Sequence, residues 1–405
     1  MMAWRMSLPT KWRIIIACAL SLILFSAATV LHFIKQGSLL SLLSSILALV
    51  PLSFIVRFAT AEIVQTLQSH YKSDRFKDLV TPFLGSISEL CFVLVAVLRN
   101  EGRLAQMVVI GLAVSECLLT LGTGVFRGLR LDSFESHPII IARHNSRLLL
   151  MSIITIVAPA VLNFASSDKD KDANLLARIA AIALLPQFFY HVYFLHLTYT
   201  RSVSAETNNS PEPPTPSSTE SKITLKSLRT AALGKLEDSY ESQLSLPFSL
   251  VLFVFSITLL LVDSIYITTS IESSNDATST SFVPLIIIPI ALSGIESILS
   301  IAMADEELVP YVVEAMTWST MRNLFIFGPV AVILTWTLDA SIIMTPDGFQ
   351  TVVLGLAIVF LFSVLHYSPA AALGVRRPYG NPEGLFLITS FFMFAVASFT
   401  FGKTD

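Results

Sequence analysis

The sequence predicts an all-α polytopic membrane protein, and three observations carry this prediction. Of the 405 residues, 54% are hydrophobic and 14% are charged, whereas soluble domains contain about 25% charged residues. Apolar windows of about 20 residues, long enough to cross a bilayer as helices, recur along the whole chain. Two of these windows, far apart in the sequence, each contain a lone carboxylate near the middle, close to proline and small residues.

In chain order, the apolar windows predict about eleven transmembrane helices, at approximately 13–34, 38–62, 79–99, 106–126, 147–165, 175–199, 246–268, 282–303, 311–336, 347–367 and 383–401. The first window is longer than the roughly 7–15 apolar residues of a signal-peptide core, and no convincing cleavage site follows it. We therefore expect it to be retained as a transmembrane helix.

Basic residues favour a cytosolic N-terminus, because cytosolic loops carry an excess of Lys and Arg. Four segments that this orientation places in the cytosol contain such residues: Arg5, Lys11 and Arg13; Lys72, Arg75 and Lys77; Arg127, Arg130, Arg143 and Arg147; Arg376 and Arg377. Five basic residues fall on the opposite side: Lys35, Arg99, Arg103, Lys169 and Lys171. The balance still predicts that the N-terminus is cytosolic.

A polar segment divides the chain into two halves. Residues 201–222 are rich in Pro, Ser, Thr and Glu and are predicted to be disordered, while 223–240 have the spacing of a short amphipathic helix. The predicted organisation is an N-terminal segment with one helix (1–36), five helices (37–200), a cytosolic linker (201–243) and five more helices (244–405). The third and eighth helices are separated by an odd number of crossings, so the halves form inverted repeats, as in many secondary transporters.

The two lone carboxylates are the leading candidates for a functional site. Glu89 lies within Leu79–Arg99, and Glu296 lies within Phe282–Ala302. A charge at the centre of a bilayer costs roughly 2.5–3.5 kcal/mol, so such residues usually face a polar cavity and serve a function. We expect Glu89 and Glu296 to face one another across such a cavity, with helix-helix hydrogen bonding as the structural alternative.

Other function classes find little support in the sequence. The three cysteines lie in apolar segments and form neither a disulfide framework nor a zinc motif. Gly122-Thr123-Gly124 is better explained by helix packing than by a phosphate loop. No catalytic constellation and no basic, aromatic-rich stripe for nucleic acid is present, so we expect no enzyme, no resident cofactor and no nucleic-acid partner. The oligomeric state is left open.

Several motifs, in their order along the chain, resemble a known family. They are Gly85-Ser86-Ile87-Ser88-Glu89, Leu292-Ser293-Gly294-Ile295-Glu296-Ser297, Phe58-Ala59-Thr60-Ala61-Glu62, Gly128-Leu129-Arg130 and Val262-Asp263-Ser264-Ile265. The chain is similar to the cation/proton exchangers of the calcium/cation antiporter superfamily, the vacuolar calcium–proton antiporters of fungi and plants. The resemblance implies that Glu89 and Glu296 bind the cation and exchange it for protons, and that Ser86 and Ser293 help to shape the site.

Several positions differ from the family pattern. Ser86 and Ser293 replace the motif asparagines, and Glu116 stands where an asparagine is usual, adding a third acid to the expected site. Ser319-Thr320-Met321-Arg322 replaces Ser-Ser-x-Gln and introduces a positive charge. Leu259 replaces an acid of the seventh helix and leaves Glu62 without a counterpart, so Glu62 is either an interfacial acid or a gate or proton relay.

These differences leave two predictions for Arg322. Either it forms an ion pair with Glu116 and leaves Glu89 and Glu296 to bind the cation, or it replaces the cation and locks the protein in one state. The first predicts a secondary active antiporter that exchanges calcium or a related cation for protons by alternating access in the vacuolar or another internal membrane. The second predicts a transport-silent membrane protein of the same fold with a regulatory or structural role.

Overall fold

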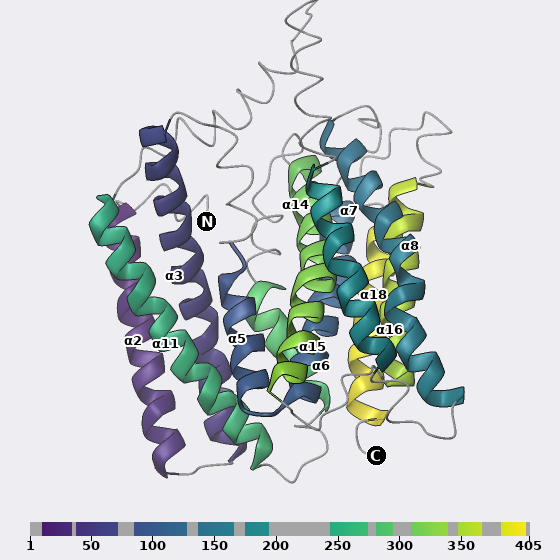
Figure 1. Cartoon of the computed structure of the whole chain (residues 1–405). Coiled ribbons are helices and arrows are strands. Elements are labelled where there is room, and N and C mark those ends of the chain that lie inside the picture. Colours follow the sequence, from purple (N-terminus) through teal and green to yellow (C-terminus); the bar gives the residue numbers. More distant parts are fainter. Residues whose placement is uncertain are drawn as a thin grey trace, which may run out of the picture.

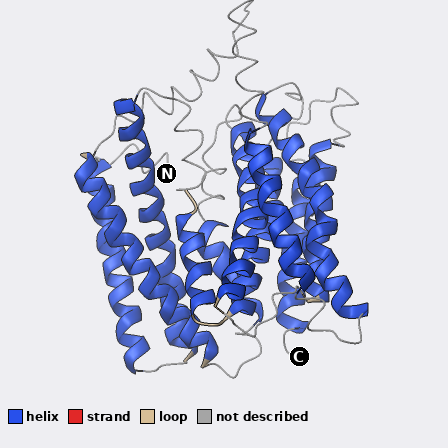
Figure 2. Cartoon of the chain, in the orientation of Figure 1, coloured by secondary structure: helices blue, strands red, loops and turns tan. Residues whose placement is uncertain are grey.

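The computed structural model describes residues 10–34, 38–71, 85–127, 137–165, 175–193, 244–273, 281–294, 309–338, 347–366 and 382–401. These residues form helices joined by short loops and contain no strand (Figure 2). The predicted linker at 201–243 and the predicted cation ligand Glu296 lie outside the described residues, so the structure does not place them.

The helices lie within or around the predicted windows. They are α2 (Thr10–Ile34), α3 (Leu39–Tyr71), α5 (Ile87–Leu98), α6 (Gly102–Val114), η1 (Ser115–Thr120), α7 (Leu121–Arg127), α8 (His137–Ala165), the helix Leu175–Tyr193, α11 (Leu246–Glu272), η3 (Val283–Ile287), η4 (Ile290–Gly294), α14 (Val309–Arg322), η5 (Asn323–Phe327), α15 (Gly328–Thr337), α16 (Gly348–His366) and α18 (Pro382–Phe401). Two predicted boundaries were wrong: α3 continues to Tyr71 instead of ending at 62, and α8 begins at His137 instead of at 147. Within the described residues, eight helices are long and apolar enough to cross a membrane. The total of about eleven and the inverted-repeat layout stay predictions.

The two shorter apolar helices belong to the windows with the lone carboxylates. They are Ile87–Leu98, with Glu89 in its first turn, and Val283–Gly294, after which the described residues stop. The first turn of α5 leaves backbone N–H groups without intrahelical partners, so Glu89 lies beside irregular backbone.

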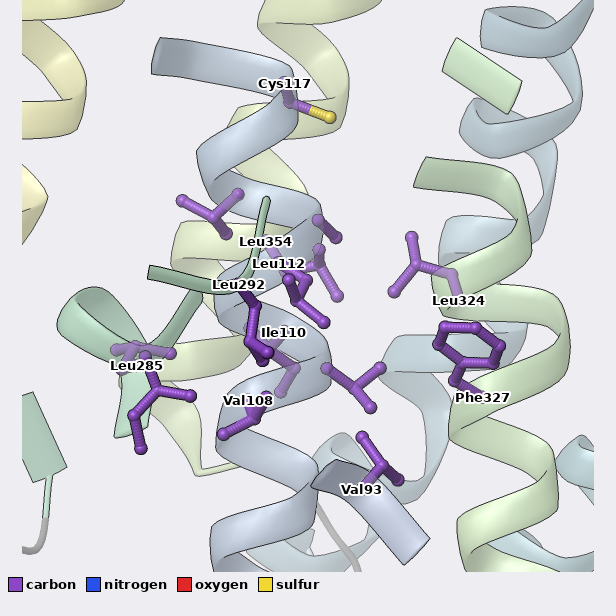
Figure 3. Close-up of a cluster of buried hydrophobic side chains, with 14 of the residues drawn as sticks. Val93, Val108, Ile110, Leu112, Cys117, Leu285, Leu292, Leu324, Phe327 and Leu354 are labelled. Carbon is purple, nitrogen blue, oxygen red and sulfur yellow. The ribbon is translucent and has the colours of Figure 1, made fainter. Parts of the chain in front are cut away.

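The continuous run α6–η1–α7 forms the centre of the molecule and is almost completely buried. Figure 3 shows side chains from several helices around α6, among them Val93 of α5, Leu285 of η3, Phe327 of η5 and Leu354 of α16. This apolar packing fixes the position of η1, which carries Glu116.

Wide helical turns of the π type interrupt the central helices. The segments η1 and η5 each lie between two α-helical segments, in α6–η1–α7 and α14–η5–α15. The two runs contact one another, since η1 packs against α14 and η5 packs against α6. Such π segments often occur at functional sites, because they change the direction in which side chains project.

Three helices form a separate group at one side of the molecule: α2, α3 and α11 (Figure 1). Each of the three contacts the other two, and α3 and α11 pack along most of their length. We call them the α2–α3–α11 group. It contacts the rest of the protein through α5 and η4, so any site at this junction is built from both parts.

The outer helices present large apolar side chains to their surroundings. On α2 and α3 these include Ile23, Phe33, Leu40 and Leu47, each more than half exposed. Contiguous exposed apolar surface of this kind is unusual in soluble monomers and fits contact with lipid.

Two glycines allow helices to approach more closely than any side chain permits. A Cβ at Gly122 would lie 3.0 Å from the carbonyl oxygen of Gly384 and 2.9 Å from Leu387 Cβ. This agrees with the packing role expected for the Gly122-Thr123-Gly124 stretch. A Cβ at Gly111 of α6 would fall on the backbone of Leu285 and 2.6 Å from Pro289 Cγ, so Gly111 seats η3 against the central helix.

Replacing Gly111 by Ala is therefore expected to lower stability by about 1–3 kcal/mol, the usual cost of overpacking a tight contact. The measurement is the melting temperature of the purified protein in detergent. Gly355→Ala is the matched control, because its Cβ would make an ordinary contact at 3.6 Å with Ile153 Cδ1. Equal melting temperatures for wild type and Gly111→Ala would show that α6 and η3 are not packed this closely.

Candidate functional site

Glu89 lies at the beginning of α5, directly after the turn formed by Gly85 and Ser86. Its side chain is 1% exposed, and Ser88 Oγ donates a hydrogen bond to its Oε2 at 2.9 Å. The N-terminal end of a helix carries a partial positive charge, which stabilises a carboxylate in the first turn. The start of α5 and the Ser88 hydroxyl therefore both direct partial positive charge at the Glu89 carboxyl group.

Arg57 of α3 forms an ion pair with Glu89. The same guanidinium nitrogen, Nη2, donates to Glu89 Oε1 and to the carbonyl oxygen of Leu292 in η4, the latter at 3.2 Å. One side chain of the α2–α3–α11 group thus holds the start of α5 and the last turn of η4. Breaking a buried pair of this type leaves an uncompensated charge, which is costly in a low-dielectric environment.

Glu116 of η1 forms a second polar cluster. Its Oε1 accepts a hydrogen bond from Ser319 Oγ at 2.6 Å. Its Oε2 accepts from Thr320 Oγ1 and from Asn323 Nδ2, both at 3.2 Å. These donors lie on α14 and η5, so the carboxylate joins the two central helical runs.

Arg322 reaches Glu116 through a hydroxyl group. Its Nη2 donates to Ser319 Oγ at 2.7 Å, and the same hydroxyl donates to Glu116. Ser319 thus bridges Glu116 and Arg322. An ion pair between these two residues was one of the two predictions for Arg322; the structure connects them through this hydroxyl group, because Ser319 lies one turn before Arg322 on the same face of α14.

The two clusters form one electrostatic unit. Glu116 interacts electrostatically with Glu89, Arg57 and Arg322. Two carboxylates and two guanidinium groups thus balance in formal charge among the described groups of the site. Asn323 Oδ1, in contrast, is buried and accepts no hydrogen bond within the described part of the chain, so it can accept one from water or coordinate a cation.

The other predicted residues occupy supporting positions. Ser86 is buried at the start of α5, where its side chain makes no capping bond. Ser293 is also buried and donates to the carbonyl oxygen of Pro289 at 3.3 Å. Glu62 is 1% exposed and accepts a hydrogen bond from the backbone nitrogen of Leu244 at 3.3 Å. Such burial does not fit the interfacial acid that was one alternative for Glu62.

Arg57, Ser88, Thr320 and Asn323 belong to the site but were not predicted. A signal for Arg57 was available, because it is the only charged residue between Leu39 and Ala61 in a strongly apolar stretch. A charge at that depth predicts a function or a partner. Asn323 directly follows Arg322 in an apolar helix, which is the same kind of signal.

The described residues contain no group of three or more His, Cys, Asp or Glu side chains that could hold a metal ion. Hydroxyl, amide and backbone carbonyl oxygens lie beside the carboxylates of Glu89 and Glu116. Hard cations such as Ca²⁺ accept such oxygen ligands readily.

Residues 37–197 match the family described as "Sodium/calcium exchanger protein". "Vacuolar cation/proton exchanger 3" of Oryza sativa subsp. japonica is 23% identical over 381 residues, covering 92% of this chain and 83% of that protein. "Vacuolar calcium ion transporter" of Cryptococcus neoformans is 22% identical over 387 residues, covering 79% of this chain and 63% of that protein.

Solved structures of YfkE show the same fold. One of them, of native YfkE, aligns with a TM-score of 0.65 over 96% of this chain and 99% of YfkE, at 16% sequence identity. A second, of a selenium-substituted form, is described as a Ca²⁺/H⁺ antiporter protein and aligns with a TM-score of 0.62.

The Glu116 cluster can be tested by a double-mutant cycle. Arg322→Gln is expected to lower stability by about 1–3 kcal/mol, because it leaves a buried carboxylate less compensated. Adding Glu116→Asn should recover part of this loss, giving a coupling of about 0.5–3 kcal/mol in melting experiments in detergent. In a Ser319→Ala background the coupling should shrink, since Ser319 connects the two charges.

A control for this cycle is Arg103→Gln. It breaks an exposed ion pair in which Arg103 Nη2 lies 2.9 Å from Asp347 Oδ2. Exposed pairs contribute only about 0–1 kcal/mol, so this change should barely alter the melting temperature. If the effects of Glu116→Asn and Arg322→Gln simply add, the two residues do not interact through Ser319.

Proposed function

Since this chain belongs to the calcium/cation antiporter superfamily, we propose that it is a secondary active antiporter that exchanges a cation for protons across the membrane it spans. The observation that carries the proposal is Glu89, a buried carboxylate at a helix start whose partner is the guanidinium group of Arg57. Any further positive species that binds this carboxylate competes with the guanidinium group already there. The vacuolar names of the relatives support an internal membrane as its location.

In the proposed mechanism three positive species compete for Glu89. A proton neutralises the carboxylate and releases Arg57. A cation that enters the site repels the guanidinium group and takes its place. Two unit charges 4 Å apart interact with about 4 kcal/mol at an effective dielectric constant of 20, so Arg57 and a bound cation do not share Glu89. Exclusive occupancy of one carboxylate by proton or cation is what couples their movements.

We propose Ca²⁺ as the cation. It takes six to eight oxygen ligands, and the described site offers Glu89, Glu116, the free Oδ1 of Asn323 and the hydroxyl groups beside them. In this proposal Glu296, with Ser293 and Ser86, completes the set. Because Arg57 and Arg322 balance the charge of Glu89 and Glu116, a divalent cation requires either the displacement of a guanidinium group or the added charge of Glu296.

The position of the ion pair also suggests how access alternates. Arg57 connects the α2–α3–α11 group to α5 and η4, through Glu89 and the carbonyl oxygen of Leu292. Releasing Arg57 removes both links at once. We propose that the α2–α3–α11 group then shifts against the rest of the protein, so that the site opens to the other side of the membrane.

A flux assay tests the proposal. Wild-type protein in sealed vesicles with an imposed pH gradient should take up radioactive Ca²⁺ faster than empty vesicles. Glu89→Gln should reduce this uptake at least about tenfold, since a loss of roughly 1.4 kcal/mol of binding already suffices. If wild-type vesicles take up no more Ca²⁺, Na⁺ or K⁺ than empty ones, the antiporter proposal is wrong and a transport-silent role replaces it.

The role of Arg57 has its own test. Arg57→Gln removes the competitor at Glu89, so the cation concentration for half-maximal uptake should fall about tenfold, equivalent to roughly 1.4 kcal/mol. Arg57→Lys keeps a competing charge and should stay close to wild type. An unchanged or higher half-maximal concentration in Arg57→Gln would contradict competition, and melting temperatures would show that both variants are folded.

A further inference from the structure

Asp263 of α11 is a buried acid that the proposed exchange site does not use. Its side chain is completely buried, and neither carboxyl oxygen has a hydrogen-bond partner within the described part of the chain. An ionised carboxylate without partners is very costly in an apolar interior, and even a neutral one costs free energy unless it is hydrogen-bonded. Such a group requires a hydrogen-bond partner, and water is one molecule that can supply it.

Other buried polar atoms of the same three helices also have no partner in the described residues. They are Nδ1 of His32 in α2, the hydroxyl groups of Ser41 and Ser45 in α3, and the hydroxyl group of Ser270 in α11. Buried polar groups are nearly always satisfied by protein or by ordered water. Several orphaned groups on mutually packed helices therefore indicate buried water rather than separate defects.

These groups gather at one end of the α2–α3–α11 group. His32 lies in the last turn of α2, and its ring stacks on Tyr266 of α11 at a centroid distance of 4.3 Å. Ser41 and Ser45 lie in the first two turns of α3, one above the other at a spacing of four residues. Ser270 lies in the last turn of α11, seven residues and thus about 10 Å along the helix from Asp263.

This end of the α2–α3–α11 group is also where charged side chains reach the surface. Glu272 is exposed in the last turn of α11, and the exposed Arg99 donates to Thr269 Oγ1 of α11 at 3.1 Å. The orphaned groups of His32 and Ser270 thus lie in the last turns of their helices, at an end where charged side chains are exposed.

The charged groups on neighbouring helices do not compensate Asp263. The helices packed against α11 carry His32 on α2, Arg57 and Glu62 on α3, and Glu89 and Arg99 on or beside α5, and α11 itself carries Glu272. None of these described groups forms a hydrogen bond or an ion pair with Asp263. Burial without a counter-charge favours the neutral, protonated carboxyl group.

We propose that Asp263 is a second proton-binding site, separate from the Glu89 and Glu116 clusters, and that water reaches it from the end of the α2–α3–α11 group lined by His32, Ser41, Ser45 and Ser270. Protonation forms an O–H bond at one carboxyl oxygen of Asp263, and the hydronium ion that delivers the proton leaves as water. A buried water needs two to four polar partners, and Asp263 together with these four residues provides them.

Infrared spectroscopy of the purified full-length protein tests this proposal. A protonated carboxyl group gives a carbonyl stretching band that carboxylates lack. The wild type should show such a band at neutral pH, and Asp263→Asn should lose a component of it. Glu272→Gln is the matched control, because it removes an exposed acid from the same helix and should leave the band unchanged. A spectrum of Asp263→Asn identical to that of the wild type would overturn the proposal.

Deuterium exchange tests the water path and needs no variant at Asp263. After transfer to D₂O, the carbonyl band component that is lost in Asp263→Asn should shift to lower frequency as fast as exposed groups exchange their protons. Ser45→Val should slow this shift. A component that keeps its frequency would exclude access by water and refute the proposal. If Asp263→Asn does not fold, Asp263→Glu should retain a protonated band at a displaced frequency.

The inference stands independently of the exchange activity. A wild-type protein that moves no cation in vesicles would remove the proposed function and would not affect the infrared result. Conversely, an infrared result that overturns the Asp263 proposal would not affect the proposed competition between Arg57, protons and cations for Glu89.

Discussion

The ion pair between Arg57 and Glu89 is the interaction on which the arrangement of the site depends. Both charges lie within the apolar interior of a helical bundle, where an isolated charge is very costly. Arg57 is 18% exposed and Glu89 only 1%, so each compensates the other where water reaches them poorly. The guanidinium group also binds the carbonyl oxygen of Leu292 at the last turn of η4. One side chain of α3 therefore holds the start of α5 and a backbone carbonyl group of η4 in a low-dielectric medium.

Irregular backbone and polar side chains coincide in the centre of the molecule. Glu116 lies in η1, and one of its donors, Asn323, opens η5. A regular α-helix satisfies its backbone internally and presents side chains at fixed angles. A π segment widens one turn and redirects a side chain without ending the helix, which is tolerated in a membrane only inside the protein. The tight apolar packing around α6 provides this shielded position.

A site with two guanidinium groups behaves differently from a site of carboxylates alone. A pair of bare carboxylates attracts any cation, whereas Glu89 here already has a resident positive partner in Arg57. In the proposed exchange, the proton and the transported cation each act by displacing that partner. Binding and release then depend on the difference between two similar interaction energies. Because Arg57 can return to Glu89, the site can release its bound cation. Two carboxylates without such a partner would hold the cation more tightly.

The sequence alone determined the helical membrane fold, because transmembrane helices need about 20 apolar residues, although α3 and α8 extend beyond their predicted windows. It also singled out Glu89, since a carboxylate in an apolar stretch stands out without knowledge of its neighbours, and Glu116, which differs from the pattern of the family that the chain resembles. The tertiary structure decided their partners. Arg57 is 32 residues from Glu89, and Ser319 is 203 residues from Glu116, and no local pattern encodes such pairings. Ion pairs between distant residues follow from how helices pack, so only the folded chain revealed that Glu89 pairs with Arg57 and that Asp263 has no such partner among the described residues.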